Sequence, residues 1–371
     1  MRVASRNLAI LFFALLVLGL VIYRSSGMLH LGDFSGAKLL AAVRDARESY
    51  LLLSILAIYA CYAVRALRWR EFQKHVGQAR FWNIYAMTLA GFSAVFLLGR
   101  AGEPVRPLLL ARKGKLPVAD TFGIYVLERL LDTASTAVIA AIGLLVFTTH
   151  VHNGEAASTL QTAAKTGGSL LAAGVLGAAV LLVYVRLHGS AMLERRLQGW
   201  LASHGWRASV AKIILGFIRG VQTIRTIRDL AAAVIYSAIH WAMVLAVYFL
   251  VTQSFGGKLR ELSLGDVMLV LAFTLVGSVV QLPAVGGGSQ ALAIFAYTRV
   301  FGVESEPAVA AAIVLWLISF AFCSLAGVPI LIREGFSLGQ LKELAEHEKT
   351  ILEKEAVAGA GTNMRLGEKP E

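Results

Sequence analysis

The chain has 371 residues, of which 57% are hydrophobic and only 16% are charged, and its mean hydropathy is +0.69. An average soluble domain carries about 25% charged residues, so this composition excludes a typical soluble protein. Several apolar runs approach the roughly 20 residues that a helix needs to cross a bilayer, which predicts a multi-pass membrane protein. The net charge of +12 fits cytoplasmic loops and anionic headgroups, since no nucleic-acid-binding motif is present.

The first apolar run, residues 7–23, has no small-residue cleavage site after it, so we interpret it as an uncleaved first span. A second span is predicted over residues 49–66. A basic cluster follows it, and such clusters stay in the cytoplasm, which places the N-terminus inside and residues 24–48 outside. The cluster consists of Arg65, Arg68, Arg70, Lys74 and Arg80.

Residues 81–98 form a third apolar run, which breaks at residues 99–104 and continues to the basic residues Arg112, Lys113 and Lys115. If this run crossed the membrane fully, the strongly basic segment 186–228 would lie outside, against the positive-inside rule. If residues 81–116 instead dip in and return, the spans 118–148 and 168–185 leave that segment in the cytoplasm. The sequence therefore predicts a re-entrant hairpin over residues 81–116.

A similar pattern follows. Residues 229–252 cross outward, residues 265–282 enter and break at 283–288, residues 289–302 leave again, and residues 307–332 cross inward. The prediction is an all-α integral membrane protein with about six full transmembrane helices and two re-entrant helical hairpins that enter from opposite faces. We expect one transmembrane domain over residues 1–335, a charged and partly disordered cytoplasmic tail over 336–371, and both termini in the cytoplasm. Opposed broken helices that meet near the midplane are a recurring transporter design.

Charged residues interrupt the first hairpin at Arg100, Glu103 and Arg106, close to Gly102 and Pro104. Proline suits the first turn of a helix, where its missing N–H costs nothing. A half-helix that begins here would direct its free N–H groups and the positive end of its dipole into the protein. With two arginines nearby, the natural ligand is a phosphate. The alternative is a cytoplasmic loop with ordinary surface charges.

A second polar group, Tyr125, Glu128, Arg129 and Asp132, lies inside the span 118–148. Glu128 and Asp132 are four residues apart, so they share one face of a helix. Charges within a span usually face protein or water, and they mark function by default. The alternative is a structural ion pair, with Glu128 bound to Arg100 or Arg106.

The third polar group interrupts the second hairpin. Glycine permits close backbone approach and positive φ, and Ser289 could cap the helix that follows. The alternative is a tight turn between two spans. The group consists of Gln281, Pro283, Gly286, Gly287, Gly288, Ser289 and Gln290.

Weaker signals come from histidines and cysteines. His240 and Tyr236 are four residues apart in the span 229–252, and a packing role is the simpler interpretation. Cys61 and Cys323 lie in apolar runs without a CxxC or Cys/His spacing, so we expect core residues rather than a disulfide or a zinc site. No metal or other cofactor is expected, since Ser/His/Asp, HExxH and Walker patterns are absent from the sequence.

The ordered motifs Leu98–Arg106, Leu127–Asp132 and Pro283 with Gly286–Gly288 resemble the flippase-like domain family, also called the lysylphosphatidylglycerol synthase transmembrane family. The similarity covers most of residues 5–335. The best-known members join a membrane domain that translocates an aminoacylated phospholipid to a soluble domain that synthesises it. After Arg333, 38 residues remain, too few for a transferase domain. The resemblance therefore implies a stand-alone membrane domain without the synthase.

The leading hypothesis is a lipid translocase of the bacterial inner membrane, rather than an enzyme. It would move a phospholipid or another anionic, polyprenyl-type or hopanoid-type envelope lipid, whose headgroup binds in a polar midplane cavity. The expected partner is a membrane lipid with an anionic headgroup, a lipid-biosynthesis enzyme is a second candidate partner, and nucleic acid is not expected. Two alternatives stay open: a headgroup-modifying membrane enzyme with Glu128 and Asp132 as acid and base, and a non-transporting accessory subunit.

Overall fold

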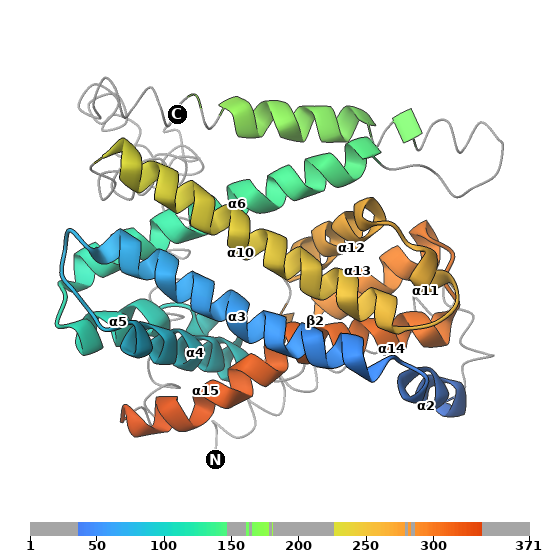
Figure 1. The fold of residues 1–371 in the computed structure, drawn as a ribbon, viewed down its shortest axis with the longest axis horizontal. Coiled ribbons are helices and arrows are strands. Elements are labelled where there is room, and N and C mark those ends of the chain that lie inside the picture. Colours follow the sequence, from blue (N-terminus) through green and yellow to red (C-terminus); the bar gives the residue numbers. More distant parts are fainter. Residues whose placement is uncertain are drawn as a thin grey trace, which may run out of the picture.

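A computed structural model describes residues 36–146, 161–162, 165–177, 180, 226–278, 281–282 and 286–335. Within these residues the chain is helical apart from two strands of two residues each (Figure 1). The predicted span 7–23, most of the basic segment 186–228 and the tail 336–371 lie outside the described residues. The total number of spans therefore stays a prediction.

Five segments of the described chain are long and apolar enough to cross a membrane. They are Glu48–Gln73, Phe81–Gly102, Asp120–Val146, Ile227–Ser254 and Ser305–Arg333. They correspond to helix α3 (Glu48–Gln73), helix α4 with its continuation, helix α6 (Val118–Val146), helix α10 (Ile227–Ser254) and a last helix in three parts. The predicted run 168–185 is represented by helical residues 165–177, where Gly168 packs on Leu144 of α6.

Large apolar side chains cover the outside of these helices, while ionisable groups lie inside. Leu52 and Leu56 of α3 are exposed, as are Ile235 and Ile239 of α10. The guanidinium of Arg68 is fully buried. Apolar groups outside and charges inside are the arrangement expected when lipid is the solvent. The described helices thus form a multi-pass membrane protein.

Helices α3 and α10 run antiparallel along the middle of the molecule (Figure 1). At one end, Lys74 Nζ lies 2.6 Å from Asp229 Oδ1. At the other end, the backbone N–H of Arg47 donates to the carbonyl of Ser254 at 2.8 Å. These pairs define two ends of the bundle, which we name by a nearby lysine: the Lys113 end and the Lys258 end.

The first hairpin begins and ends at the Lys113 end. It consists of α4 (Phe81–Leu98), the short helix η2 (Gly99–Gly102) and α5 (Val105–Gly114). Helix α5 returns along α4, so that Gly91 of α4 lies against Arg106 and a Cβ at Gly102 would overlap the carbonyl of Ala94. The helix break after Leu98 and the helix that begins after Pro104 lie where the sequence predicted them, while re-entry into the membrane stays a prediction.

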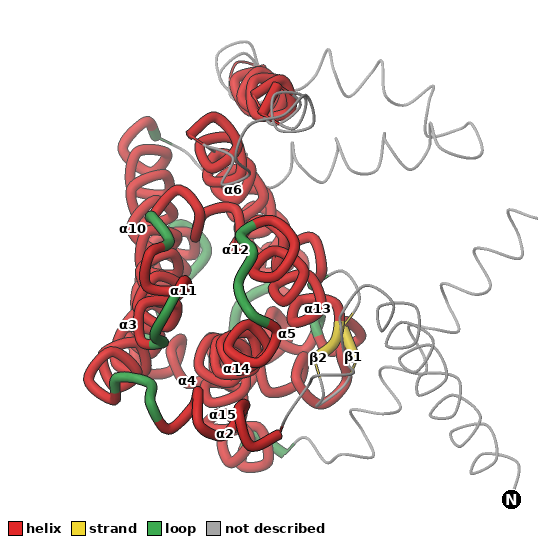
Figure 2. The backbone as a smooth tube through the Cα atoms, turned by 90° about the vertical axis from the view of Figure 1, so that its right-hand side faces the viewer, coloured by secondary structure: helices red, strands yellow, loops and turns green. Residues whose placement is uncertain are grey.

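The second hairpin begins and ends at the Lys258 end, close to the short helix α11 (Lys258–Glu261). It consists of α12 (Leu264–Gly277), strands β1 (Gln281–Leu282) and β2 (Gly286–Gly287), α13 (Gly288–Phe295) and the π-helical turn η3 (Ala296–Val300). The strands pair antiparallel, with Gln281 opposite Gly287 (Figure 2). Gly277 packs directly on the carbonyl of Gly288, an approach that excludes a Cβ.

The start of α13 differs from the prediction. Ser289 was expected to cap this helix, but α13 begins at Gly288 and the capping residue is Gly287, whose φ is 132°. The backbone N–H of Gly287 donates to Oε1 of Gln290 at 2.5 Å. Only glycine adopts this φ without strain. Ser289 lies inside the first turn, and its cap prediction was wrong because the helix begins two residues earlier than expected, at Gly288.

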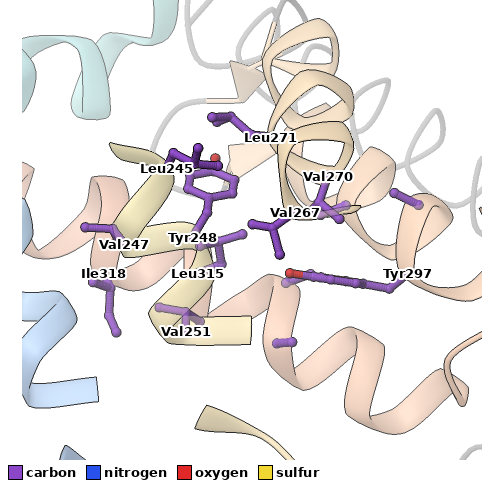
Figure 3. Packing of buried hydrophobic residues seen from close by; sticks show 14 of the residues in the cluster. Leu245, Val247, Tyr248, Val251, Val267, Val270, Leu271, Tyr297, Leu315 and Ile318 are labelled. Atoms are coloured by element: carbon purple, nitrogen blue, oxygen red, sulfur yellow. The ribbon is translucent and has the colours of Figure 1, made fainter. Parts of the chain in front are cut away.

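The tips of the two hairpins meet, with β1 lying against η2. The second hairpin is fixed to α10 by an apolar core with two buried hydroxyl contacts (Figure 3). Tyr297 Oη lies 2.8 Å from Thr252 Oγ1, and Thr274 Oγ1 donates to Tyr248 Oη at 3.0 Å. The last helix closes the core and comprises α14 (Ser305–Trp316), the π-helical segment η4 (Leu317–Ala321) and α15 (Phe322–Arg333). At the Lys258 end, helix α2 (Gly36–Arg44) packs on α14.

Candidate functional site

A cavity of about 310 Å³ lies between the two hairpins and the long helices α3, α6 and α10. Its polar lining comes mainly from α3, η2, α5 and α6, and its apolar lining from α10, α12, α13 and the last helix. The charged side chains of the lining are Arg65, Arg100, Glu103, Arg106 and Arg129, beside Tyr125 and His240, and uncharged polar side chains come from Thr274, Ser278, Ser289, Gln290 and Ser319. The apolar group includes Val244, Leu271, Leu275, Ala293, Ala312, Leu315, Trp316 and Phe320. Arg100 is also exposed, so the cavity reaches the molecular surface at η2.

Most of the residues predicted from the sequence gather at this cavity. Arg100, Glu103, Arg106, Tyr125, Arg129, Ser289 and Gln290 line it. Glu128 and Asp132 lie behind the lining and are buried. Gly102 forms the close turn of the first tip, and the backbones of Gln281, Gly286, Gly287 and Gly288 form the second tip. Pro283 lies outside the described residues.

Glu128 is the centre of a buried ion network. Its Oε1 accepts a hydrogen bond from Arg68 Nη2 at 2.9 Å, and its Oε2 accepts one from Arg106 Nη2. Arg65 Nη1 lies 3.4 Å from Oε1. The structural ion pair with Arg106, which the sequence left as an alternative, is therefore present, and it belongs to a larger network.

Asp132 is the second carboxylate of the network, one helical turn beyond Glu128. Its Oδ1 lies 2.8 Å from Arg68 Nη1 and accepts a hydrogen bond from Trp241 Nε1 at 3.2 Å. Its Oδ2 accepts one from Arg129 Nη2 at 2.8 Å. Arg68 thus bridges both carboxylates. Glu128 and Asp132 lie on one face of α6, as their spacing of four residues predicted.

Arg65 and Arg68 are the main correction to the sequence analysis. Both were assigned to a cytoplasmic basic cluster, but Arg68 is fully buried and Arg65 is 8% exposed. Helix α3 continues to Gln73, beyond the predicted span, so both side chains lie within the helix and turn inward. Arg65 and Arg68 are three residues apart and share one face of the helix, whereas Arg70 lies on the exposed face. This spacing was the signal in the sequence that could have identified them as inward-facing.

Aromatic rings separate the guanidinium groups along the cavity wall. Arg65 and Arg106 place their Cζ atoms 5.0 and 5.5 Å from the ring centroid of Phe92. Arg106 and Arg129 place theirs 5.3 and 5.4 Å from the ring of Tyr125. Such contacts of cations with ring faces are attractive and increase in strength away from water. The three arginines therefore form a fixed row along one wall.

His240 contributes more than the expected packing. Its Nε2 lies 2.8 Å from Arg65 Nη2, and because arginine can only donate, this nitrogen is the acceptor. The proton is then on Nδ1, which faces Cys61 Sγ at 3.1 Å and the Cys61 carbonyl at 3.4 Å, so the ring is neutral. Tyr236 is not part of the lining. Cys61 and Cys323 are buried, as expected, although Cys61 also lines the cavity.

Several donors at this wall are left without acceptors. Arg106 Nε and Arg129 Nε are buried, and no hydrogen-bond partner is present for them among the described residues, while buried Arg65 Nη1 has only the ion-pair contact with Glu128 Oε1 at 3.4 Å. The carboxylate of Glu103 already accepts a hydrogen bond from Tyr125 Oη at 2.8 Å. A buried donor without a partner costs about 1–3 kcal/mol, and more when it is charged. This wall is therefore suited to bind an anion.

No three His, Cys, Asp or Glu side chains in the described part of the chain are grouped so that they could hold a metal ion. The π-helical segment η4 carries Ser319 and Phe320 into the lining. Segments of this kind are frequently found at functional sites.

The helices, the two opposed hairpins and the buried charge network define a polytopic helical membrane protein with an internal polar site. The chain belongs to the lysylphosphatidylglycerol synthase TM region family, whose model matches residues 8–327. This match confirms the resemblance found in the sequence and indicates a function related to membrane lipids. No curated protein and no solved structure shows a significant match to the chain.

Proposed function

We propose that this protein is a lipid translocase of the bacterial inner membrane, which carries the headgroup of an anionic phospholipid or other envelope lipid through its internal cavity. The observation that supports this most directly is the cavity itself, which is lined by guanidinium groups from α3, η2, α5 and α6 and by largely apolar side chains from α10, α12, α13 and the last helix. An amphipathic lipid needs both: donors for its phosphate, and an apolar path for its acyl chains. The cavity also argues against an accessory subunit, for which we expect a packed interior.

The length of the half-helices supports a site near the middle of the bilayer. Helix α5 has 10 residues between η2 and the basic group at Lys113 and Lys115. At about 1.5 Å per residue it rises roughly 15 Å, half of the hydrocarbon thickness of about 30 Å. If Lys113 lies among the headgroups, the tip at Gly99–Gly102 is near the midplane. Trp82, exposed at the start of α4, fits the same interface, where tryptophan is enriched.

Basic residues suggest the orientation. Within the described residues, basic side chains lie at both ends, so the segment 186–228 decides between them. The Lys113 end has Arg70, Lys74, Arg80, Arg112, Lys113, Lys115 and Arg333, and the Lys258 end has Lys38, Arg44, Arg47, Lys258, Arg260 and Arg299. Helix α10 also begins at this end, so the basic segment 186–228 leads directly into it. Basic loops stay in the cytoplasm, so we place the Lys113 end and both termini inside.

Transport by purified protein in vesicles is the decisive experiment. The full chain is reconstituted with a trace of headgroup-labelled phospholipid, and an impermeant reductant reports the fraction of label that reaches the outer leaflet. We expect wild-type protein to accelerate exchange over empty vesicles and Arg106→Ala to abolish the acceleration. Arg106→Lys should also fail, because an ammonium lacks the bidentate fork of a guanidinium.

Two results would contradict the proposal. One is normal transport by a well-folded Arg106→Ala protein, and the other is no acceleration for any anionic lipid by the folded wild type. Mass spectrometry of the recovered lipids tests the alternative of a headgroup-modifying enzyme: a translocase returns each lipid with an unchanged mass.

A further inference from the structure

The charge around the cavity is unbalanced. The described residues place more guanidinium groups than carboxylates at this site: Arg65, Arg68, Arg100, Arg106 and Arg129 against Glu103, Glu128 and Asp132. The formal excess is two positive charges, because His240 is neutral in its observed contacts. Arg100 is exposed at the mouth of the cavity, and the rest of this excess lies inside. Uncompensated charge is costly in a low dielectric, so the site in use is expected to hold a balancing anion.

The carboxylates cannot provide that balance from within. Glu128 already forms ion pairs with Arg65, Arg68, Arg106 and Arg129, Asp132 forms them with Arg65, Arg68 and Arg129, and Glu103 accepts a hydrogen bond from Tyr125. Among the buried N–H groups without a hydrogen-bond partner are those of three lining arginines, Arg65, Arg106 and Arg129, which stand in one row beside Phe92 and Tyr125. Such a row matches a group with several anionic oxygens, each of which can accept from a different arginine.

We infer that the cavity selects a doubly anionic headgroup, a terminal phosphate monoester or a diphosphate, over a singly charged phosphodiester. This inference rests on the proposed function and names its substrate class. A phosphate monoester carries about −1.5 to −2 charges at pH 7, which matches the excess of the site. An aminoacylated headgroup is disfavoured, since its ammonium groups would meet the guanidinium row and find no free carboxylate.

The test compares binding of lipids that differ in headgroup charge to the purified full chain in detergent. The probes are phosphatidic acid, phosphatidylglycerol and lysylphosphatidylglycerol with identical short acyl chains, together with inorganic phosphate. The readout is competitive binding by native mass spectrometry. We expect phosphatidic acid to bind at least about tenfold more tightly than phosphatidylglycerol, because it can accept one more hydrogen bond from a charged donor. Lysylphosphatidylglycerol should bind most weakly.

Arginine variants connect this preference to the row. Arg129→Gln removes one guanidinium while Asp132 keeps Arg68 at 2.8 Å, so the fold is expected to survive. The affinity for phosphatidic acid should then fall about tenfold, toward the affinity for phosphatidylglycerol. The matched control, Arg70→Gln, removes an exposed guanidinium from α3 and should leave the preference unchanged. Arg129→Lys keeps the charge and should retain the order of the lipids.

Equal binding of phosphatidic acid and phosphatidylglycerol, or tightest binding of lysylphosphatidylglycerol, would overturn the inference. Inorganic phosphate that binds as tightly as phosphatidic acid would identify a site for a soluble anion and would overturn it as well. The vesicle experiment separates this inference from the proposed function. Selective binding without transport refutes the translocase alone, and equal transport of both anionic lipids refutes the charge selectivity alone.

Discussion

Glu128 holds two arginines that have few other partners, which makes it the residue on which the buried network depends. Glu128→Gln removes the carboxylate that binds Arg106 and one of the two that bind Arg68. Because a stranded buried charge is destabilising, we expect a loss of about 3–5 kcal/mol, seen as a lower melting temperature in detergent and a lower protein level. Asp120→Asn, an exposed change near the start of the same helix, is the control and should cost at most about 1 kcal/mol. Equal stability of the two variants would show that the network is not structural.

We expect that the charges of Arg106 and Glu128 cannot be interchanged. In an isolated pair, Arg106→Glu combined with Glu128→Arg would restore stability lost in the single variants. Here, a guanidinium at position 128 would lie beside Arg68 and Arg65, which now contact Glu128 at 2.9 and 3.4 Å. Since like charges at this distance repel strongly away from water, the double variant should be no more stable than either single variant. Melting temperatures of the three proteins test this, and recovery in the double variant would contradict it.

Glycines at the hairpin tips set how closely the helices approach. A Cβ at Gly102 would overlap the carbonyl of Ala94 and the N–H of Val95, which are backbone atoms that cannot rotate away. We expect Gly102→Ala to cost about 1–3 kcal/mol and to open the first tip, with loss of lipid transport. Gly123→Ala is the matched control, since nothing lies within 4 Å of a Cβ at this position of α6. Alanine there should be neutral or stabilising by up to about 1 kcal/mol. Unchanged melting temperature and transport in Gly102→Ala would contradict the role of the tip.

The whole molecule predicts which face of the membrane each end meets. The native cysteines Cys61 and Cys323 are 1% and 0% exposed, so they should give little background with a thiol reagent. Arg80→Cys lies at the start of α4 and Arg260→Cys in α11, and both positions are exposed. In intact cells, an impermeant maleimide should label Arg260→Cys and should label Arg80→Cys only after permeabilisation. Ser203→Cys, within the basic segment, should behave as Arg80→Cys does.

The opposite pattern in that experiment would reverse the orientation while keeping the fold. Labelling of Arg80→Cys and Arg260→Cys from the same side would be more serious, because it would place both ends of α3 and α10 on one face. The two opposed hairpins would then no longer enter from different sides, and the midplane cavity would lose its basis.

Local sequence patterns determined the membrane class, the helix break at Gly99 and most of the charged residues around the cavity. They also predicted a break in the second hairpin, but placed it at residues 283–288, whereas α12 already ends at Gly277. Apolar length and the special backbone freedom of glycine are local properties, and charges within an apolar run must face inward in any fold. The sequence therefore predicted Arg100, Glu103, Arg106, Tyr125 and Arg129 as members of one site.

Only the tertiary structure decided which charges bind one another. Arg68 is 60 residues away from Glu128 in the chain, and charge type alone does not distinguish it from the exposed Arg70. Trp241 and His240 join the network from α10, a helix whose sequence shows no charge near them. The excess of guanidinium groups emerges when α3, α5 and α6 pack around one cavity, because pairing in low dielectric depends on distances that no local pattern contains.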